Sequence, residues 1–186
     1  VPIWARELKF GARCINARAE TLASTPAFRL AYRKRRCLVP LNAFFEWTGE
    51  PGHKIKWRIG LKDEPLFALA GLWEWWKDPA SQQGVETYTI VTTRANDLLA
   101  PIHDRMPVVI AERDYDRWLD ADDPATDLLE PFADEALQVY RETFRSSAGL
   151  VKPHAALCVW ALAADTDEEA LRLFESRARW KMDRNL

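Results

Sequence analysis

Several residue types and patterns are scarce in this 186-residue sequence, and each scarcity narrows the class of protein. It has three cysteines, an odd number without a CxxC spacing, which argues against a disulfide framework and a zinc knuckle. Its longest uncharged apolar run, residues 155–164, falls far short of the roughly 20 residues that a membrane-spanning helix needs. We therefore expect no membrane partner and a location in the reducing cytoplasm.

Sequence motifs for common cofactors and metals are absent as well. The sequence contains no GxGxxG, Walker loop, HExxH or GxSxG pattern. We therefore predict no cofactor and no metal site. A Ser/His/Asp triad stays open, because composition does not exclude one and no local pattern favours one.

The charge of the chain is unevenly distributed. Residues 1–62 hold 13 Lys and Arg against 4 Asp and Glu, a net charge of +9, whereas residues 63–186 hold 13 against 24, a net charge of −11. A basic first third indicates either a surface that binds a polyanion or a solvated basic face without a partner. Charge alone leaves both interpretations open.

Alternating and apolar runs in the first two thirds predict a β-rich domain. A basic helix is expected after Thr25 and Pro26, which have the pattern of an N-cap and a first-turn proline, and a short helix is expected at residues 112–119. This pattern indicates an α+β fold that is mostly antiparallel and barrel-like, with peripheral helices. The predicted strands are residues 37–47, 55–61, 66–73, 85–92 and 106–110.

The sequence changes character after Asp120. We expect one domain over residues 1–120, an acidic linker over residues 121–134 and a separate tail over residues 135–186. The tail is predicted to be largely helical. Its helices are expected at residues 133–146 and, after a capping box, at residues 166–181.

Four positions stand out as candidates for chemistry or binding. Asn16 opens a polar run that follows an apolar pair, Glu46 lies in an aromatic strand, and His103 lies between two prolines. The alternatives are a capped turn, an outward-facing glutamate and a structural histidine. Trp4 lies near basic residues in a loop-like segment, where it either stacks on a base or packs in the fold.

Three linked motifs resemble those of a known family. They are INARAET at residues 15–21, RRCLVPLNAFFEW at residues 35–47 and IVTTRANDLLAPIHDRMPVVI at residues 90–110. Their order and spacing are similar to those of the SOS response-associated peptidase (SRAP) family, the abasic-site processing proteins. The resemblance covers roughly residues 1–120 and implies a β-rich α+β domain with a positively charged channel for single-stranded DNA.

The resemblance also implies roles for individual residues. Asn16, Glu46 and His103 match the family's catalytic asparagine, glutamate and histidine. Arg18 matches an arginine that meets DNA at the lesion, and Trp4 matches an aromatic residue at the DNA junction. Members of the family shield abasic sites by covalent attachment through an N-terminal cysteine, whose amine and thiol close a thiazolidine ring on the sugar aldehyde.

The sequence departs from the family pattern at two places. Family members begin Met-Cys, whereas residue 1 is Val1, so we expect a domain that lacks its first strands and its nucleophile and does not crosslink as it stands. The internal Cys14 and Cys37 have no free α-amine. Residues 135–180 instead resemble a C-terminal piece of luciferase-like flavin monooxygenases, without any flavin-site residue.

These observations lead to one main hypothesis and two alternatives. The main hypothesis is a truncated abasic-site processing domain without its nucleophile, whose partner is single-stranded DNA with abasic sites. We expect it to be a monomer, cytoplasmic and nucleoid-associated when bound to DNA. The alternatives are a non-covalent single-stranded nucleic-acid-binding module and a fragment of a flavin-dependent oxidoreductase.

Overall fold

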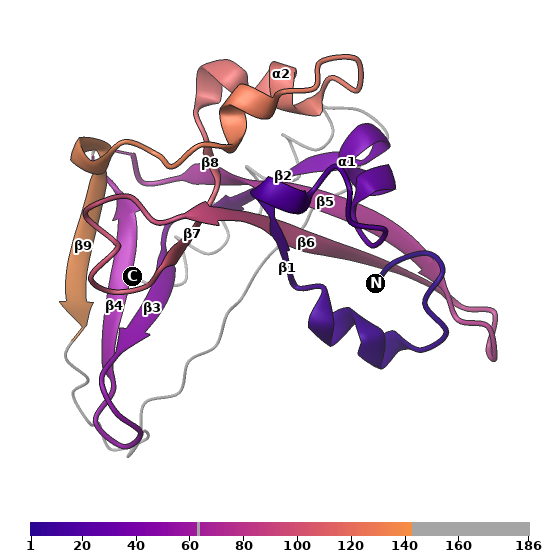
Figure 1. Cartoon of the computed structure of the whole chain (residues 1–186), viewed down its shortest axis with the longest axis horizontal. Coiled ribbons are helices and arrows are strands. Elements are labelled where there is room, and N and C mark those ends of the chain that lie inside the picture. Colours follow the sequence, from indigo (N-terminus) through magenta and orange to yellow (C-terminus); the bar gives the residue numbers. More distant parts are fainter. Residues whose placement is uncertain (63, 143–186) are drawn as a thin grey trace, which may run out of the picture. The chain divides into compact units, whose positions relative to one another are not determined.

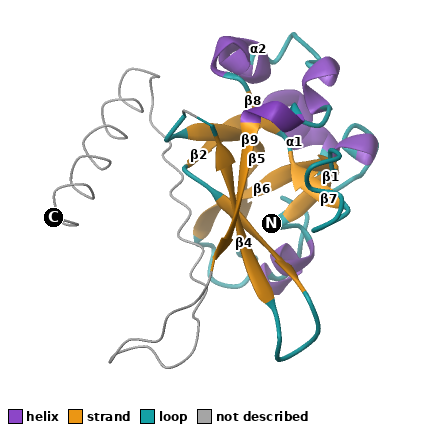
Figure 2. Cartoon of the chain, turned by 90° about the vertical axis from the view of Figure 1, so that its left-hand side faces the viewer, coloured by secondary structure: helices purple, strands orange, loops and turns teal. Residues whose placement is uncertain are grey.

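The computed structural model describes residues 1–62 and 64–142. Their strands form two β-sheets, joined by loops and short helices (Figure 1; Figure 2). This arrangement confirms the predicted mixed α+β class with few helices. Neither sheet closes into a barrel among the described residues, so the barrel-like closure is not found there. The predicted helical tail beyond residue 142 lies outside the described residues.

The larger sheet has six strands and is mostly antiparallel. Its main path runs β1–β6–β5–β2, while β7 pairs with β6 and β8 pairs with β5. Strand β1 runs parallel to β6, and the other pairs are antiparallel. The six strands are Asn16–Arg18 (β1), Arg36–Leu41 (β2), Phe67–Lys77 (β5), Gly84–Arg94 (β6), Arg105–Pro107 (β7) and Val109–Ile110 (β8).

The smaller sheet corrects one of the helix predictions. Its three strands are Phe44–Thr48 (β3), Ile55–Leu61 (β4) and Leu137–Glu142 (β9), in the order β3–β4–β9. Residues 133–146 were expected to be helical, and the prediction is wrong for β9. Strand β4 pairs with β3 along one edge and with β9 along the other. Burial of the Leu137 side chain in this arrangement outweighs the helix propensity of the segment.

The other predicted elements agree more closely with the structure. The run at residues 37–47 divides into β2 and β3, and the run at residues 55–61 is β4. Strands β5 and β6 are each longer than expected, at 11 residues. The predicted short helix is present as Glu112–Asp114 (η3) followed by Tyr115–Leu119 (α2).

The basic helix begins later than its capping pattern indicates. Helix α1 covers Arg29–Lys34, and its N-cap position is Phe28 rather than Thr25. The Thr25 hydroxyl donates instead to the Thr21 carbonyl at 2.8 Å. The remaining helical segments are single 3₁₀ turns or little more: Leu8–Arg13 (η1), Ala19–Thr21 (η2), Thr126–Leu129 (η4) and Asp134–Ala136 (η5).

A hydrophobic core joins the larger sheet to the two α-helices. Ala17 from β1, Leu72 from β5 and Val91 from β6 are almost fully buried, and Tyr32 from α1 and Trp118 from α2 pack against this cluster. The indole Nε1 of Trp118 donates to a β2 carbonyl at 2.9 Å. The core therefore fixes β1 and β6 firmly in the larger sheet.

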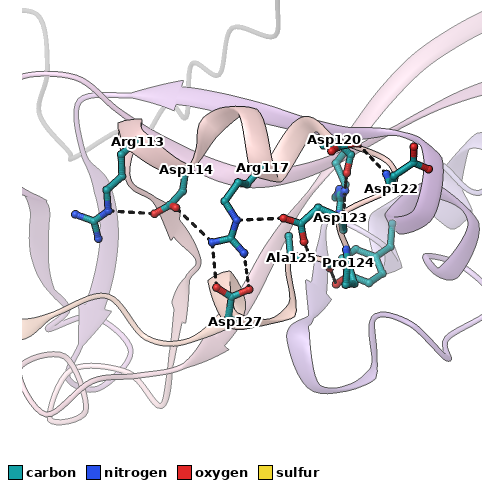
Figure 3. Close-up of polar contacts among 11 residues, drawn as sticks. Arg113, Asp114, Arg117, Asp120, Asp122, Asp123, Pro124, Ala125 and Asp127 are labelled. Carbon is teal, nitrogen blue, oxygen red and sulfur yellow. Dashed lines mark hydrogen bonds and ion pairs between the residues drawn. The ribbon is translucent and has the colours of Figure 1, made fainter.

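A polar network holds residues 120–127 against the helices (Figure 3). Arg117 contacts Asp114 at 3.5 Å, Asp123 at 3.1 Å and Asp127 at 2.9 Å. The Tyr32 hydroxyl donates to the Pro124 carbonyl at 2.5 Å. Residues 121–134 were expected to be an acidic linker, and they carry these contacts within the same compact unit as the strands.

Candidate functional site

Strand β1 presents two of the predicted residues on one face. Asn16 and Arg18 are exposed, and Ala17 between them is fully buried. This alternation follows from the two-residue period of a strand, with the central side chain in the core. The register pairs Asn16 with Ile90 and Arg18 with Thr92 of β6. The two polar side chains therefore lie beside the end of β6.

An arginine from β7 reaches the same place. The guanidinium of Arg105 donates to both carboxylate oxygens of Glu20, at 2.5 and 2.9 Å, and to the Thr92 carbonyl at 2.6 Å. This hydrogen bonding lowers the pKa of Glu20, and the charge of Arg18 lowers it further. Two arginines therefore flank one carboxylate where β1, β6 and β7 meet.

His103 lies just before β7 and is partly exposed. Its Nδ1 accepts a hydrogen bond from the backbone N–H of Arg105 at 3.0 Å. The carboxylate of Asp104 lies 3.3 Å from the same nitrogen. Because Nδ1 takes the Arg105 amide, Nε2 is the ring nitrogen left to meet another molecule.

The loop that carries His103 extends from the larger sheet to the segment that precedes β9 (Figure 1). In this loop, the Asn96 side chain donates to the Phe132 carbonyl at 2.9 Å. The backbone N–H of Leu98 donates to the Asp134 carboxylate at 3.4 Å. These contacts join the β6–β7 loop to the segment that leads into β9 of the smaller sheet.

Charged residues of this loop influence the pKa of Glu46 on β3. It is half-buried beside strand β4, where its register partner is Trp57. Burial raises the pKa of Glu46, the charge of His103 lowers it, and the charge of Asp104 raises it. A carboxyl group whose pKa is raised and which feels the charge of a histidine is suited to taking up and returning a proton.

The contacts of Trp4 are with other residues than those described above. Its indole Nε1 donates to the Pro26 carbonyl at 3.4 Å, and its ring packs edge-on against Phe10 with centroids 5.1 Å apart. The side chain is nevertheless 52% exposed. Trp4 is therefore partly packed in the fold and partly open to solvent.

Sequence reasoning missed two members of this cluster as site residues. Glu20 belongs to the polar run at residues 15–21, and Arg105 follows His103 by two positions. Both lay inside the motifs that drew attention, but the ion pair between them joins residues 85 positions apart. A single sequence carries no signal for such a long-range pair.

The described part of the chain has neither a cluster of metal ligands nor a membrane-spanning helix. No group of three or more His, Cys, Asp or Glu side chains there is arranged to hold a metal ion. No helix within residues 1–62 or 64–142 is both long and apolar enough to cross a bilayer.

Comparisons with known proteins find relatives of this chain. The abasic site processing protein YoqW of Bacillus subtilis is 40% identical over 146 residues, which cover 76% of this chain and 65% of YoqW. The abasic site processing protein HMCES of Gallus gallus is 28% identical over 143 residues, covering 64% of this chain and 43% of HMCES.

A crystal structure and a family match agree with these relatives. The structure of a Bacteroides thetaiotaomicron protein has a TM-score of 0.70 and 34% identity, covering 76% of this chain and 65% of the other. The chain thus spans just under two thirds of the length of YoqW and of the Bacteroides protein. The family described as SOS response associated peptidase (SRAP) matches residues 1–143, past the boundary expected at residue 120. The chain therefore belongs to the SRAP family.

Proposed function

We propose that this chain forms the DNA-binding part of an abasic-site processing protein. In this proposal it binds single-stranded DNA at an abasic site, as a cytoplasmic monomer that joins nucleoid DNA. The observation that carries the proposal is that Arg18 and Arg105 flank Glu20 where β1, β6 and β7 meet. His103 accepts a hydrogen bond from the Arg105 amide N–H, and its charge acts on Glu46 of β3. The names of the relatives support the same class of substrate.

Three exposed residues have roles that suit the binding of a DNA strand with an opened abasic sugar. The guanidinium of Arg18 is exposed and pairs with a backbone phosphate, which makes binding depend on salt. Asn16, on the same face of β1, donates and accepts hydrogen bonds at the sugar oxygens. Trp4 offers an exposed indole for stacking at the edge of the bound strand.

Glu46 and His103 are proposed to move protons. His103 presents Nε2–H, which donates to the ring oxygen as its bond to the anomeric carbon breaks and then polarises the aldehyde oxygen for attack by the amine. Glu46, with its raised pKa, takes a proton from the attacking amine and returns it when water leaves. Both groups therefore act at the same carbon of the sugar.

The proposed covalent step uses an N-terminal cysteine, which is not residue 1 of this sequence. The α-amine condenses with the aldehyde and releases one water, which leaves a C=N bond. The thiol then adds across that bond: sulfur joins the carbon, and its proton passes to the nitrogen. The product is a thiazolidine ring, and no oxidant or cofactor takes part.

A denaturing gel tests this function. The chain is compared with two forms that carry a segment ahead of Val1, one beginning Met-Cys and the other Met-Ser. Each is mixed with single-stranded DNA that contains either an abasic site or a tetrahydrofuran analogue without an aldehyde. We expect an adduct that resists denaturation only for the Met-Cys form with the aldehyde. If that combination forms no adduct, the catalytic assignment fails.

A second function is favoured by one observation, the net charge of +9 on residues 1–62. This alternative is a module that holds single-stranded nucleic acid without chemistry. It predicts binding that weakens with salt and is equal for the abasic and the tetrahydrofuran strands. Preference for the aldehyde-containing strand in the same gel and in a binding titration separates the two functions.

A further inference from the structure

Glu20 is an unexpected residue on this surface. It rests on η2, directly after β1, and its carboxylate is 51% exposed between Arg18 and Arg105. A negative charge there repels the phosphates that the proposed function brings to Arg18. A carboxylate that opposes ligand binding in this way needs another role, and its hydrogen bonds indicate one.

The carboxylate of Glu20 fixes the side chain of Arg105. The two parallel N–H···O bonds between them, at 2.5 and 2.9 Å, are the forked geometry that orients a guanidinium most strictly. The Thr92 carbonyl accepts a third bond at 2.6 Å. Arg105 is therefore held on two sides, by η2 and by β6, and its side chain is only 22% exposed.

The backbone of Arg105 in turn controls His103. Strand β7 is only three residues long and begins at Arg105. Anchoring of the Arg105 side chain therefore fixes the backbone at the start of the β6–β7 pairing. The backbone N–H of Arg105 donates to His103 Nδ1 at 3.0 Å, and an N–H group cannot act as an acceptor. This bond places the proton of the neutral ring on Nε2.

Other groups compete for the same ring nitrogen. The Asp104 carboxylate lies 3.3 Å from Nδ1, and the Arg105 carbonyl lies 3.1 Å from it. Both are acceptors, so both favour the tautomer with a proton on Nδ1. A small movement of the Arg105 backbone therefore changes which nitrogen of His103 carries the proton.

We propose that Glu20 is a positioning residue: by clamping Arg105, it holds the amide that keeps His103 in the Nε2–H tautomer. The inference deepens the proposed function, on which it rests for the use that the reaction makes of His103. The Nε2–H donor is the group that polarises the sugar oxygen. Glu20 thus acts through Arg105 and does not touch DNA.

Nitrogen NMR of the histidine rings in the whole chain, without DNA, tests the clamp. At a pH where the ring is neutral, we expect the Nδ1 of His103 to give an acceptor-type shift and Nε2 a protonated-type shift. In Glu20→Gln, the two shifts move toward each other because both tautomers become populated. His53, in the turn between β3 and β4, serves as an internal reference.

A matched control removes the same charge from a similar ion pair. Glu130→Gln breaks the exposed contact between Glu130 and Arg94, 3.2 Å long, and leaves Glu20 in place. We expect the His103 shifts of this control to equal those of the wild type. The proposal is overturned if Glu20→Gln also leaves them unchanged, if both variants shift them equally, or if the wild-type ring has its proton on Nδ1.

A second variant covers the case in which Glu20→Gln does not fold. Arg105→Lys retains the charge but not the fork that joins Glu20 and Thr92, so it produces the same mixture of tautomers. A wild-type spectrum for folded Arg105→Lys contradicts the proposal as firmly as one for Glu20→Gln.

A reaction measurement separates positioning from binding. In the Met-Cys form, Glu20→Gln is expected to bind lesion-free single-stranded DNA as tightly as the wild type or more tightly, because a repelling charge is lost. Its adduct forms about twofold more slowly or worse, because half of the rings then present the wrong nitrogen. Weaker DNA binding at an unchanged adduct rate overturns the proposal. Because the NMR test needs no DNA, failure of the crosslink alone reflects on the proposed function.

Discussion

Glu46 and His103 come from different parts of the fold, and the charge of His103 acts on Glu46. Glu46 lies on β3, and His103 lies in the loop before β7. The raised pKa of Glu46 arises mainly from burial, so its ionised form is disfavoured in the folded chain. A group of this kind is costly to keep for stability alone. A carboxyl group that keeps its proton to a higher pH than usual is suited to general acid–base catalysis.

Glu46→Gln is predicted to stabilise the fold at neutral pH. The folded chain binds the Glu46 proton more tightly than the unfolded chain does, so stability is lost as pH rises through the folded pKa. The neutral amide avoids that loss. We expect a gain of at most about 1 kcal/mol in the free energy of unfolding, since solvent screens a half-exposed group.

Urea unfolding across a range of pH measures this effect. The gain of Glu46→Gln should shrink as pH falls, because the wild-type carboxyl is then protonated as well. Glu50→Gln, in an exposed turn, is the control and should show no gain of this kind. A loss of stability in Glu46→Gln at neutral pH contradicts the raised pKa.

Arg18→Ala is predicted to weaken binding of single-stranded DNA and to reduce its dependence on salt. Removing one phosphate contact lowers the slope of log K against log salt by about 0.7. Fluorescence anisotropy with a labelled strand gives both quantities. Arg113→Ala removes the same charge from an exposed position on η3 and should leave the slope unchanged. Equal effects of the two variants argue against a specific phosphate contact at Arg18.

At the scale of elements, the positions of most strands were predictable from the sequence, but which strands pair with one another was not. The alternation of Ile55, Trp57 and Ile59 with basic residues predicts β4 from the sequence alone. Strand β9 was missed because its segment has no clear two-residue period and its partner lies about 80 residues earlier in the chain. A single sequence does not indicate which strand edge is available for pairing with a segment far away in the chain.

Leu137→Ala is predicted to destabilise the chain through β9. Leu137 is 2% exposed and pairs with Leu61, so truncation leaves a cavity that costs about 2–4 kcal/mol. Chemical denaturation measures the change, with Glu135→Ala at a neighbouring exposed position as the control. A change in Leu137→Ala no larger than in this control would show that β9 does not pack on β4.

Arg117→Gln is predicted to loosen the segment after α2. The hydrogen bond from Arg117 lowers the pKa of Asp127. The pKa of Asp123 is lowered first by the backbone N–H of Ala125 and then by Arg117. The network therefore stabilises the fold above the ordinary pKa of these groups. Its contribution disappears as pH falls through the lowered values.

Thermal unfolding checks this network. We expect a lower Tm for Arg117→Gln at neutral pH and low salt, and a smaller difference in high salt or acid, because exposed ion pairs are screened. Arg113→Gln, whose side chain reaches Asp114 at 3.4 Å and neither Asp123 nor Asp127, is the matched control. A difference that persists unchanged in acid contradicts the electrostatic origin.

At the scale of the whole molecule, the sequence motifs were more informative than composition. The net charge of −2 says little about a partner, whereas the three linked motifs led to the family to which the chain belongs. The motifs alone were enough to name Asn16, Glu46 and His103 as candidate site residues. Their spatial relation was not, because it depends on the β6–β7 loop and its contacts with Phe132 and Asp134.

The central claim is that residues distant in sequence form one surface that receives an abasic site. The most direct measurement is chemical-shift mapping of the labelled chain during titration with single-stranded DNA that contains one abasic site. The account predicts that the largest changes fall on Asn16, Arg18, Glu46 and His103, with little change at Asp123 and Asp127. Changes centred on α2 and the acidic segment, with Asn16 and His103 unaffected, would contradict it.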